Sequence, residues 1–250
     1  MTRVLVAGES WISVSTHYKG FDAFTSTTYH TGIAPLRDVL VADGIEVDHL
    51  PAHDVPALFP GTPEALAAYD VVVLSDIGAN SILLHPATWL SSEKSANRIE
   101  LLADWVEQGG GLAMAGGYLS FQGFEAKAAY AGTAVERVLP ARISRYDDRV
   151  ETPQGVPGLL AGDDAHPIVA GLPAQWPDLL GYNRYELPED ATLLATVGGD
   201  PLLSVRQAGA GRTLAWASDI APHWCPDEFV AWDGYRTLFT RAVRWLAKEI

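Results

Sequence analysis

The chain has 250 residues, of which 48% are hydrophobic and 19% charged, and its 31 acidic against 17 basic side chains give a formal net charge of −14. This apolar content excludes intrinsic disorder, and the length suits one α/β domain, so residues 1–250 are predicted to form a single domain. The acidic excess argues against nucleic acid and anionic membranes as partners, since both attract clustered basic side chains. The first apolar run, residues 4–7, is too short for a signal peptide or a spanning helix, so we expect a cytoplasmic protein.

The first half of the chain alternates β-branched runs with helical patterns. Strands are predicted at 4–7, 45–50, 71–74 and 112–115, and helices at 33–42, from 62 onward and at 95–108. Four such units predict a flavodoxin-like, doubly wound and mostly parallel sheet with helices on both faces. The carboxyl ends of the parallel strands then share one edge, which is where open sheets bind ligands.

The second half has a different pattern, with Pro and Gly turns between short strands. We predict strands at 135–143, 181–187, 192–197, 201–206 and 212–217, and a final helix at 229–248. These strands are expected to extend the same sheet in an antiparallel or mixed fashion.

Residues 9–31, which follow the first strand, are predicted to form an unusually long loop rich in hydroxyl, aromatic and ionisable side chains, among them Trp11, His17 and Lys19. Long connections without regular structure are uncommon and often functional, so this loop is a candidate for binding a polar small molecule. A surface loop held by its own hydrogen bonds, or a contact between copies in an oligomer, is the alternative.

The segment 115–123 is the most informative, because a strand that ends in glycines and turns at once into a helix resembles a nucleophile elbow. Tyr118 would stand at the elbow, with Gly117 and Ser120 beside it. Tyrosine can orient or protonate a substrate, but its ordinary pKa of about 10 makes it a poor acyl nucleophile. A plain turn between strand and helix is the alternative.

His223 lies in the segment 218–225, which follows the last predicted strand and should open on the same edge as the elbow. It is the best candidate for a general base, with Asp219, Asp227 or Glu228 to orient it. A purely structural histidine is the alternative.

Metal and cofactor signals are weak in this sequence. No histidine pair has helical metal-binding spacing, and the single cysteine, Cys225, excludes a disulfide within the chain and a multi-thiolate site. A site made by His17, His30 and His223 with Glu9 is left open, without support from spacing. Because no dinucleotide fingerprint or phosphate loop is present either, we expect no metal and no cofactor.

Several segments together resemble a known family over nearly the whole chain. They are Val6-Ala7-Gly8-Glu9-Ser10-Trp11, Lys19 to Thr25, Ser75-Asp76-Ile77-Gly78-Ala79-Asn80-Ser81 and Gly116-Gly117-Tyr118-Leu119-Ser120-Phe121-Gln122-Gly123. They are similar to the glutamine amidotransferase-like proteins, a branch of the class I glutamine amidotransferase superfamily. The turn His166-Pro167-Ile168 with Gly171-Leu172 also resembles ThuA-like relatives.

This resemblance implies the fold and argues against the usual reaction. Active members carry Gly-x-Cys-x-Gly-x-Gln at the elbow; here Gly116 and Gln122 match, Tyr118 stands at the cysteine position and Ser120 replaces the second glycine. Without a thiolate there, hydrolysis of glutamine through a thioester is not available, and Cys225 lies on a different loop.

The function we expect is therefore the binding or transformation of a small polar molecule, such as a sugar or an amide, at the carboxyl edge of the sheet. The catalytic candidates of this hydrolase- or lyase-type site are Tyr118, His223 and Glu9. The substrate-binding candidates are Trp11, His17, Lys19, Asp76, Gly78, Asn80, Gly117, Ser120, Gln122, Asp219 and Trp224. Backbone groups near Gly78 and Gly117 would form an anion hole. The alternative is a catalytically silent domain for binding or oligomerisation, and the third hypothesis is true glutaminase activity. We also expect the protein to form a homo-oligomer.

Overall fold

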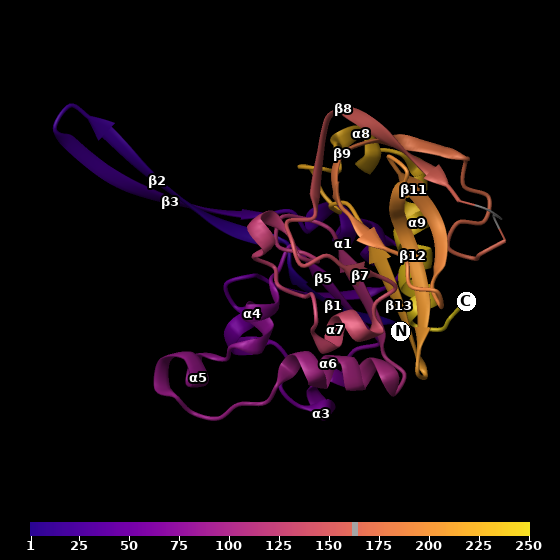
Figure 1. Ribbon diagram of the computed structural model, residues 1–250, viewed down its shortest axis with the longest axis horizontal. Helices are drawn as coiled ribbons and strands as arrows, with labels where there is room; N and C mark the ends of the chain where they lie inside the picture. Colours follow the sequence, from indigo (N-terminus) through magenta and orange to yellow (C-terminus); the bar gives the residue numbers. More distant parts are fainter. Residues whose placement is uncertain (162–164) are drawn as a thin grey trace.

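The computed structural model describes residues 1–161 and 165–250. Its centre is a nine-stranded sheet in the order β4-β1-β5-β6-β13-β12-β11-β8-β9 (Figure 1). The strands are β1 (Arg3–Gly8), β4 (Glu46–Leu50), β5 (Val71–Ser75), β6 (Gly111–Ala115), β8 (Arg149–Leu160), β9 (Gln175–Asn183), β11 (Thr192–Val197), β12 (Asp200–Ala208) and β13 (Gly211–Trp216). The strands from β4 to β13 are parallel, and the others continue antiparallel. The predicted mostly parallel sheet with a mixed extension is confirmed.

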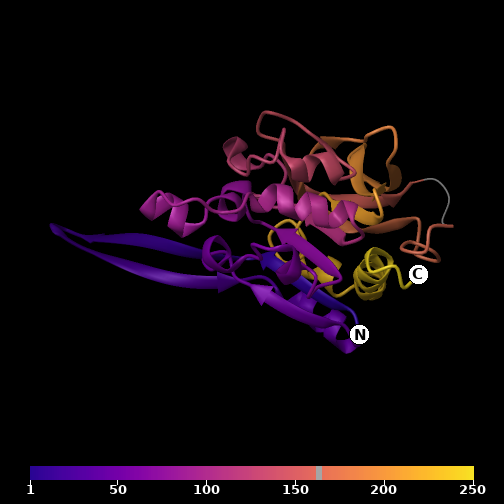
Figure 2. The same cartoon turned by 90° about the horizontal axis from the view of Figure 1, so that it is seen from below.

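Helices cover both faces of this sheet, which explains why its central strands are apolar throughout. The helices are α1 (Ala34–Ala42), α2 (Val55–Leu58), α3 (Pro63–Leu66), α4 (Ala79–Leu83), α5 (Pro86–Ser91), α6 (Arg98–Glu107), α7 (Ala134–Val138), α8 (Asp227–Val230) and α9 (Asp233–Leu246). Helices α1 and α9 pack together on one face, and α6 with α7 lies on the other (Figure 2). Every residue of β5 and β6 is buried between these layers, as expected of parallel strands in a doubly wound fold.

Strand β13 connects the parallel and antiparallel halves. It runs parallel to β6, with Trp216 opposite Ala115, and antiparallel to β12, with Trp216 opposite Leu203. The residues that follow β13 therefore emerge at the same edge as those that follow β1, β5 and β6.

Residues 9–31 were predicted to be a loop, and this prediction is wrong. The segment forms the long antiparallel hairpin β2 (Ser10–Lys19) and β3 (Asp22–Thr31), which projects from the body (Figure 1). The alternation of β-branched and aromatic residues, as in Ile12 and Val14, is a strand pattern, and Gly20 (φ 65°) supplies the left-handed turn residue.

Two further expectations are corrected. Residues 135–143, predicted as a strand, contain α7 and only the short strand β7 (Arg142–Ile143), which pairs with β10 (Tyr185–Glu186); the Thr133 side chain caps α7 by accepting from the Glu136 amide. The predicted helix at 229–248 is two helices, α8 and α9. Strand β8 was not predicted.

No helix within the described parts of the chain is long and apolar enough to cross a membrane.

Candidate functional site

Three neighbouring parallel strands end in backbone with positive φ. Glu9 follows β1 with φ 47°, Asp76 follows β5 with φ 46°, and Gly117 follows β6 with φ 142°. Left-handed backbone at a non-glycine residue costs about 1–3 kcal/mol and is common at functional sites. A Cβ at Gly117 would lie 2.8 Å from Asp76 Oδ1 and 2.9 Å from Asp219 Oδ1, so two carboxylates share the space above this glycine.

Glu9 is buried, with 6% of its surface exposed. Its Oε2 accepts a hydrogen bond of 2.5 Å from Ser75 Oγ. Burial raises the pKa of Glu9 to about 8, opposed by the Ser75 hydrogen bond and aided by the charges of Asp219 and Asp76. Glu9 therefore carries its proton at neutral pH.

Asp76 is fixed by the elbow segment. Its Oδ1 accepts from the Leu119 amide at 2.6 Å, and its own amide donates to Ser120 Oγ at 3.0 Å. Burial raises the pKa of Asp76 to about 6, against the hydrogen bond from Leu119. Burial thus raises the pKa of both acids at this edge, and raises that of Glu9 further, an order that favours Glu9 as the proton donor and Asp76 as the carboxylate.

His223 and Asp219 form a hydrogen-bonded pair on the loop after β13. His223 Nδ1 lies 3.1 Å from Asp219 Oδ2, which also accepts from the Trp224 amide at 3.0 Å. Since an ionised carboxylate can only accept, Nδ1 carries the proton and Nε2 is the ring nitrogen that can take another. The hydrogen bond and the charge of Asp219 raise the pKa of His223.

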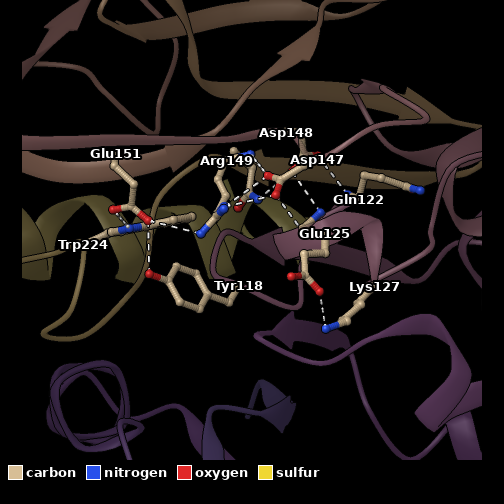
Figure 3. A network of polar contacts seen from close by, with 11 residues as sticks. Tyr118, Gln122, Glu125, Lys127, Asp147, Asp148, Arg149, Glu151 and Trp224 are labelled. Atoms are coloured by element: carbon tan, nitrogen blue, oxygen red, sulfur yellow. Dashed lines mark hydrogen bonds and ion pairs between the residues drawn. The ribbon is translucent and has the colours of Figure 1, made fainter.

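Aromatic rings border the His223–Asp219 pair on one side. The Tyr118 ring stands edge-on to His223 at 4.8 Å between centroids and to Trp224 at 5.5 Å. Glu151 accepts from both Tyr118 Oη and Trp224 Nε1, each at 3.1 Å, as Figure 3 shows. Burial and the hydrogen bond to Glu151 raise the pKa of Tyr118, so its hydroxyl stays protonated and bound.

The elbow is held from below by the buried carboxylate of Asp148. It accepts from the amides of Gln122 and Gly123, each at 2.8 Å, and from Asn183 Nδ2 at 2.9 Å (Figure 3 labels Gln122 and Asp148). Asn183 Oδ1 in turn accepts from the Gly117 amide at 2.9 Å. The side chain of Gln122 accepts from the Ala131 amide, so it braces the loop.

Two expectations about the elbow are therefore corrected. The anion hole was expected from backbone groups near Gly78 and Gly117. The Gly117 and Leu119 amides donate to Asn183 and Asp76, and the Ala79 amide donates to the Ala128 carbonyl oxygen, so these three amides are not free to form it. The strand also does not turn at once into a helix: the next helical element is the 3₁₀ turn Phe124–Ala126, beyond irregular chain.

The structure brings together Glu9, Asp76, Gly117, Tyr118, Ser120, Asp219, His223 and Trp224. Other candidates lie apart: His17 and Lys19 are far out on the hairpin, and Trp11 stacks on His30 near its root, at 5.1 Å between centroids. Gly78 caps α4, and Asn80 lies in the first turn of that helix.

The described residues offer neither a metal-binding cluster nor an accessible thiol. Within residues 1–161 and 165–250, no group of three or more His, Cys, Asp or Glu side chains is arranged to hold a metal ion. Cys225 is fully buried, and burial raises the pKa of its thiol well above the ordinary value.

Sequence reasoning missed Ser75 as the partner of Glu9, and Asp148, Arg149, Glu151 and Asn183 altogether. Three of these lie on or beside β8, which was not predicted, and Asn183 ends β9. The alternation of charged and apolar residues in Arg149-Val150-Glu151 is the short signal that could have indicated a strand there.

The parallel sheet, its helical layers and the polar carboxyl edge define a doubly wound α/β protein. The pattern of the family described as "Putative glutamine amidotransferase" matches residues 3–248, and the chain belongs to this family. Among solved structures, it is similar to cytoplasmic protein STM3548 of Salmonella typhimurium, with 40% identity, TM-score 0.93, and 97% of this chain and 98% of that one covered.

A second Salmonella typhimurium LT2 structure, cytoplasmic protein STM1381, shows 42% identity and TM-score 0.93, with 98% of this chain and 99% of that one covered. A "putative ThuA-like protein" of Parabacteroides merdae shares the fold at 13% identity and TM-score 0.58, with 99% and 90% covered. The comparison with curated proteins finds no match.

Proposed function

We propose that this chain is an enzyme that performs acid–base chemistry on a small, uncharged polar molecule, such as a sugar or an amide. The observation that carries the proposal is the convergence of Glu9, Asp76 and the Asp219–His223 pair at the ends of adjacent strands, two of them in strained backbone. Buried acids with displaced pKa values gather at functional sites far more than elsewhere.

Each group has a role that follows from its protonation. Glu9, whose pKa is about 8, is the proton donor, and Asp76, whose pKa is about 6, is the carboxylate that orients a hydroxyl or an amide. His223 is the base through Nε2, because Asp219 holds its other nitrogen.

Tyr118 takes a different role in this proposal from the catalytic one expected at the elbow. Its hydroxyl is bound to Glu151, its ring stacks on Phe124 at 5.5 Å between centroids, and it stands edge-on to His223. Tyr118 therefore serves as part of the aromatic wall that positions His223. The surrounding carboxylates disfavour an anionic substrate, since an anion would be repelled by Asp76 and Asp219.

The experiment begins with a thermal-shift screen of sugars, amides and amino acids, because a ligand that binds the native state raises the unfolding temperature. Turnover of each hit is then followed by NMR for the wild type, Glu9→Gln and His223→Ala. Loss of a positioned acid or base lowers the rate by about 100-fold or more. Glu228→Gln, at an exposed acid in α8, is the matched control and is expected to keep the wild-type rate.

The outcomes separate the competing functions. Turnover that survives both Glu9→Gln and His223→Ala contradicts the proposal. Binding without turnover assigns the chain to the silent binding domains instead. Release of ammonia from glutamine above background would support glutaminase activity. The buried Cys225 argues against that activity.

We also propose a cytoplasmic location. Its support is the description of the two Salmonella proteins as cytoplasmic.

A further inference from the structure

Among residues 1–161 and 165–250, no element covers the hairpin β2–β3, called the arm below. Both of its strands are exposed along almost their whole length, and they extend away from the sheet in both views (Figures 1 and 2). Its contacts with the body are at the root, where the Gly32 amide donates to the Glu9 carbonyl oxygen and Tyr29 stands edge-on to His53. A two-stranded hairpin alone is only marginally stable in water, so an arm of this length requires a surface to lie on.

The two faces of the arm differ in chemistry. One face carries stacked or bonded pairs: His17 stacks on Phe24 at 4.7 Å and bonds to Ser26, Lys19 lies over Phe24 at 5.7 Å, and Trp11 stacks on His30. These contacts lie within the arm and leave Phe24 52% exposed, and this face also holds the arm's charged residues, Lys19 and Asp22.

The opposite face, called the apolar face, has no charged side chain. The strand register places on it Ile12, Val14, Thr16, Tyr18, Ala23, Thr25, Thr27 and Tyr29. Val14 is 67% exposed and Tyr18 79% exposed. Exposed apolar surface on this scale marks an interaction site.

The body carries a matching surface on the side from which the arm projects. Helices α4 and α5, seen below the arm in Figure 1, border an open groove of about 290 Å³ lined by Pro56, Leu84, Pro86, Trp89 and Leu90, with Asn80 and Ser81. Trp89 is 73% exposed and Leu90 75% exposed. We call this surface the α4–α5 groove.

Charge favours a second copy of the chain as the occupant of this groove. The chain carries a net charge of −14, but Lys19 and Asp22 are the only Lys, Arg, Asp or Glu residues of the arm, so the arm is neutral. The arm therefore adds no like charge at a contact with another acidic copy, and the residues that line the α4–α5 groove are uncharged as well.

The area is also sufficient. At about 3.4 Å per residue, the ten residue pairs span about 34 Å, and at a width of about 10 Å each face offers roughly 340 Å². The α4–α5 groove, at about 290 Å³, seats only part of this length, so the surface beside the groove must cover the rest. Two exchanged arms covered along their whole faces would then bury roughly 1,400 Å², within the range of about 1,200–2,000 Å² for specific interfaces.

We propose that the arm clasps a second copy of this chain, with its apolar face lying in the partner's α4–α5 groove while the partner's arm does the same in return. Arm and groove lie on the same side of the molecule, so one two-fold axis produces both contacts, as in an isologous dimer.

The test compares Val14→Asp with Ser15→Asp by sedimentation velocity and light scattering at micromolar concentration. Both substitutions add one charge to adjacent positions of β2, but on opposite faces of the arm. The wild type and Ser15→Asp are expected to have twice the chain mass of 26.9 kDa, whereas Val14→Asp is expected to be a monomer. Circular dichroism verifies that each variant is folded.

Trp89→Asp tests the groove without touching the arm, and it too is expected to be a monomer. An equal mixture of Val14→Asp and Trp89→Asp restores one intact arm–groove contact, half of the interface, and is expected to regain a weaker dimer that forms at higher protein concentration than the wild-type dimer. A monomeric wild type, a dimer that survives Val14→Asp, or equal effects of Val14→Asp and Ser15→Asp overturn the proposal. A mixture that stays monomeric overturns the assignment of the groove.

Discussion

Ser75 holds Glu9 through two hydrogen bonds, one to its backbone and one to its side chain. The Glu9 amide donates to the Ser75 carbonyl oxygen at 2.8 Å, and Ser75 Oγ donates to Glu9 Oε2 at 2.5 Å. Because both ends of Glu9 are fixed, its carboxyl group cannot turn out to water, and the acid is positioned before any ligand arrives.

Glu9→Gln is expected to flatten the dependence of stability on pH. The pKa of Glu9 is about 8 in the folded protein against an ordinary 4.5, so the native state holds an extra proton between these values. Stability therefore falls as pH rises through this window, by roughly 3–5 kcal/mol. Urea unfolding at acidic, neutral and alkaline pH measures the slope. Glu228→Gln should keep the wild-type slope, and an unchanged slope in Glu9→Gln would show that Glu9 is ionised throughout.

Gly117→Ala is expected to lower the free energy of unfolding by roughly 2–4 kcal/mol, from backbone strain and overpacking. Its Cβ would meet Asp76 Oδ1 and Asp219 Oδ1 at less than 3 Å. Gly132 also has positive φ, 80°, but has nothing within 4 Å of a built Cβ, so Gly132→Ala should cost only about 1 kcal/mol. Equal losses in the two variants, measured by urea unfolding, would mean that the carboxylates do not crowd Gly117.

Asp219→Asn is expected to lower the pKa of His223. The hydrogen bond to Asp219 is the largest of the effects that raise this pKa, and the charges of Asp219, Glu151 and Asp76 add to it; an amide at 219 supplies no charge. An NMR titration of the histidine ring protons measures it directly. Asp227→Asn removes the other aspartate of this region, in the first turn of α8, and should leave His223 unchanged. If the pKa of His223 fell in Asp227→Asn and not in Asp219→Asn, Asp227 would be the residue that orients His223, and this assignment would be wrong.

Asp148→Asn is expected to destabilise the protein by about 2–3 kcal/mol, because the carboxylate accepts hydrogen bonds from two amides and Asn183 in a buried position. Its neighbour Asp147 is exposed and bonds to Arg149 and the Glu125 amide, so Asp147→Asn should cost under 1 kcal/mol. Thermal and urea unfolding compare the two, and a larger loss from Asp147→Asn would contradict this assignment.

Cys225 is expected to resist alkylating and disulfide reagents in the native protein and to react as one thiol after denaturation. Its side chain is fully buried, and the raised pKa keeps it protonated. Mass spectrometry after iodoacetamide treatment records the result. Rapid labelling of Cys225 in the native protein would contradict this prediction and support a role for the thiol as a nucleophile.

The sequence allowed the parallel half of the fold to be predicted because its strands are short apolar runs between helical patterns. The carboxyl edge followed from this topology, and with it the meeting of Glu9, Asp76 and His223. The hairpin was missed because its length and its many polar residues suggest a loop. Neither face of the hairpin is buried, so neither face is strictly apolar, and the alternation that marks a half-buried strand is weak.

Contacts between segments that are far apart in the sequence could not be predicted from local sequence patterns. The parallel pairing of β13 with β6 joins residues about one hundred positions apart, and no local signal encodes it. The bonds of Asn183 to Gly117 and Asp148 likewise depend on three distant segments meeting.

The position of β13 also bears on how the protein is made. This strand lies between β6 and β12, so the edge of β6 has no neighbour until residues 211–216 have been synthesised. Asp219 and His223 leave the ribosome later still, whereas Glu9 and Asp76 are made early. The acid–base group therefore cannot exist on a nascent chain that ends before residue 223, and its assembly follows the synthesis of β13.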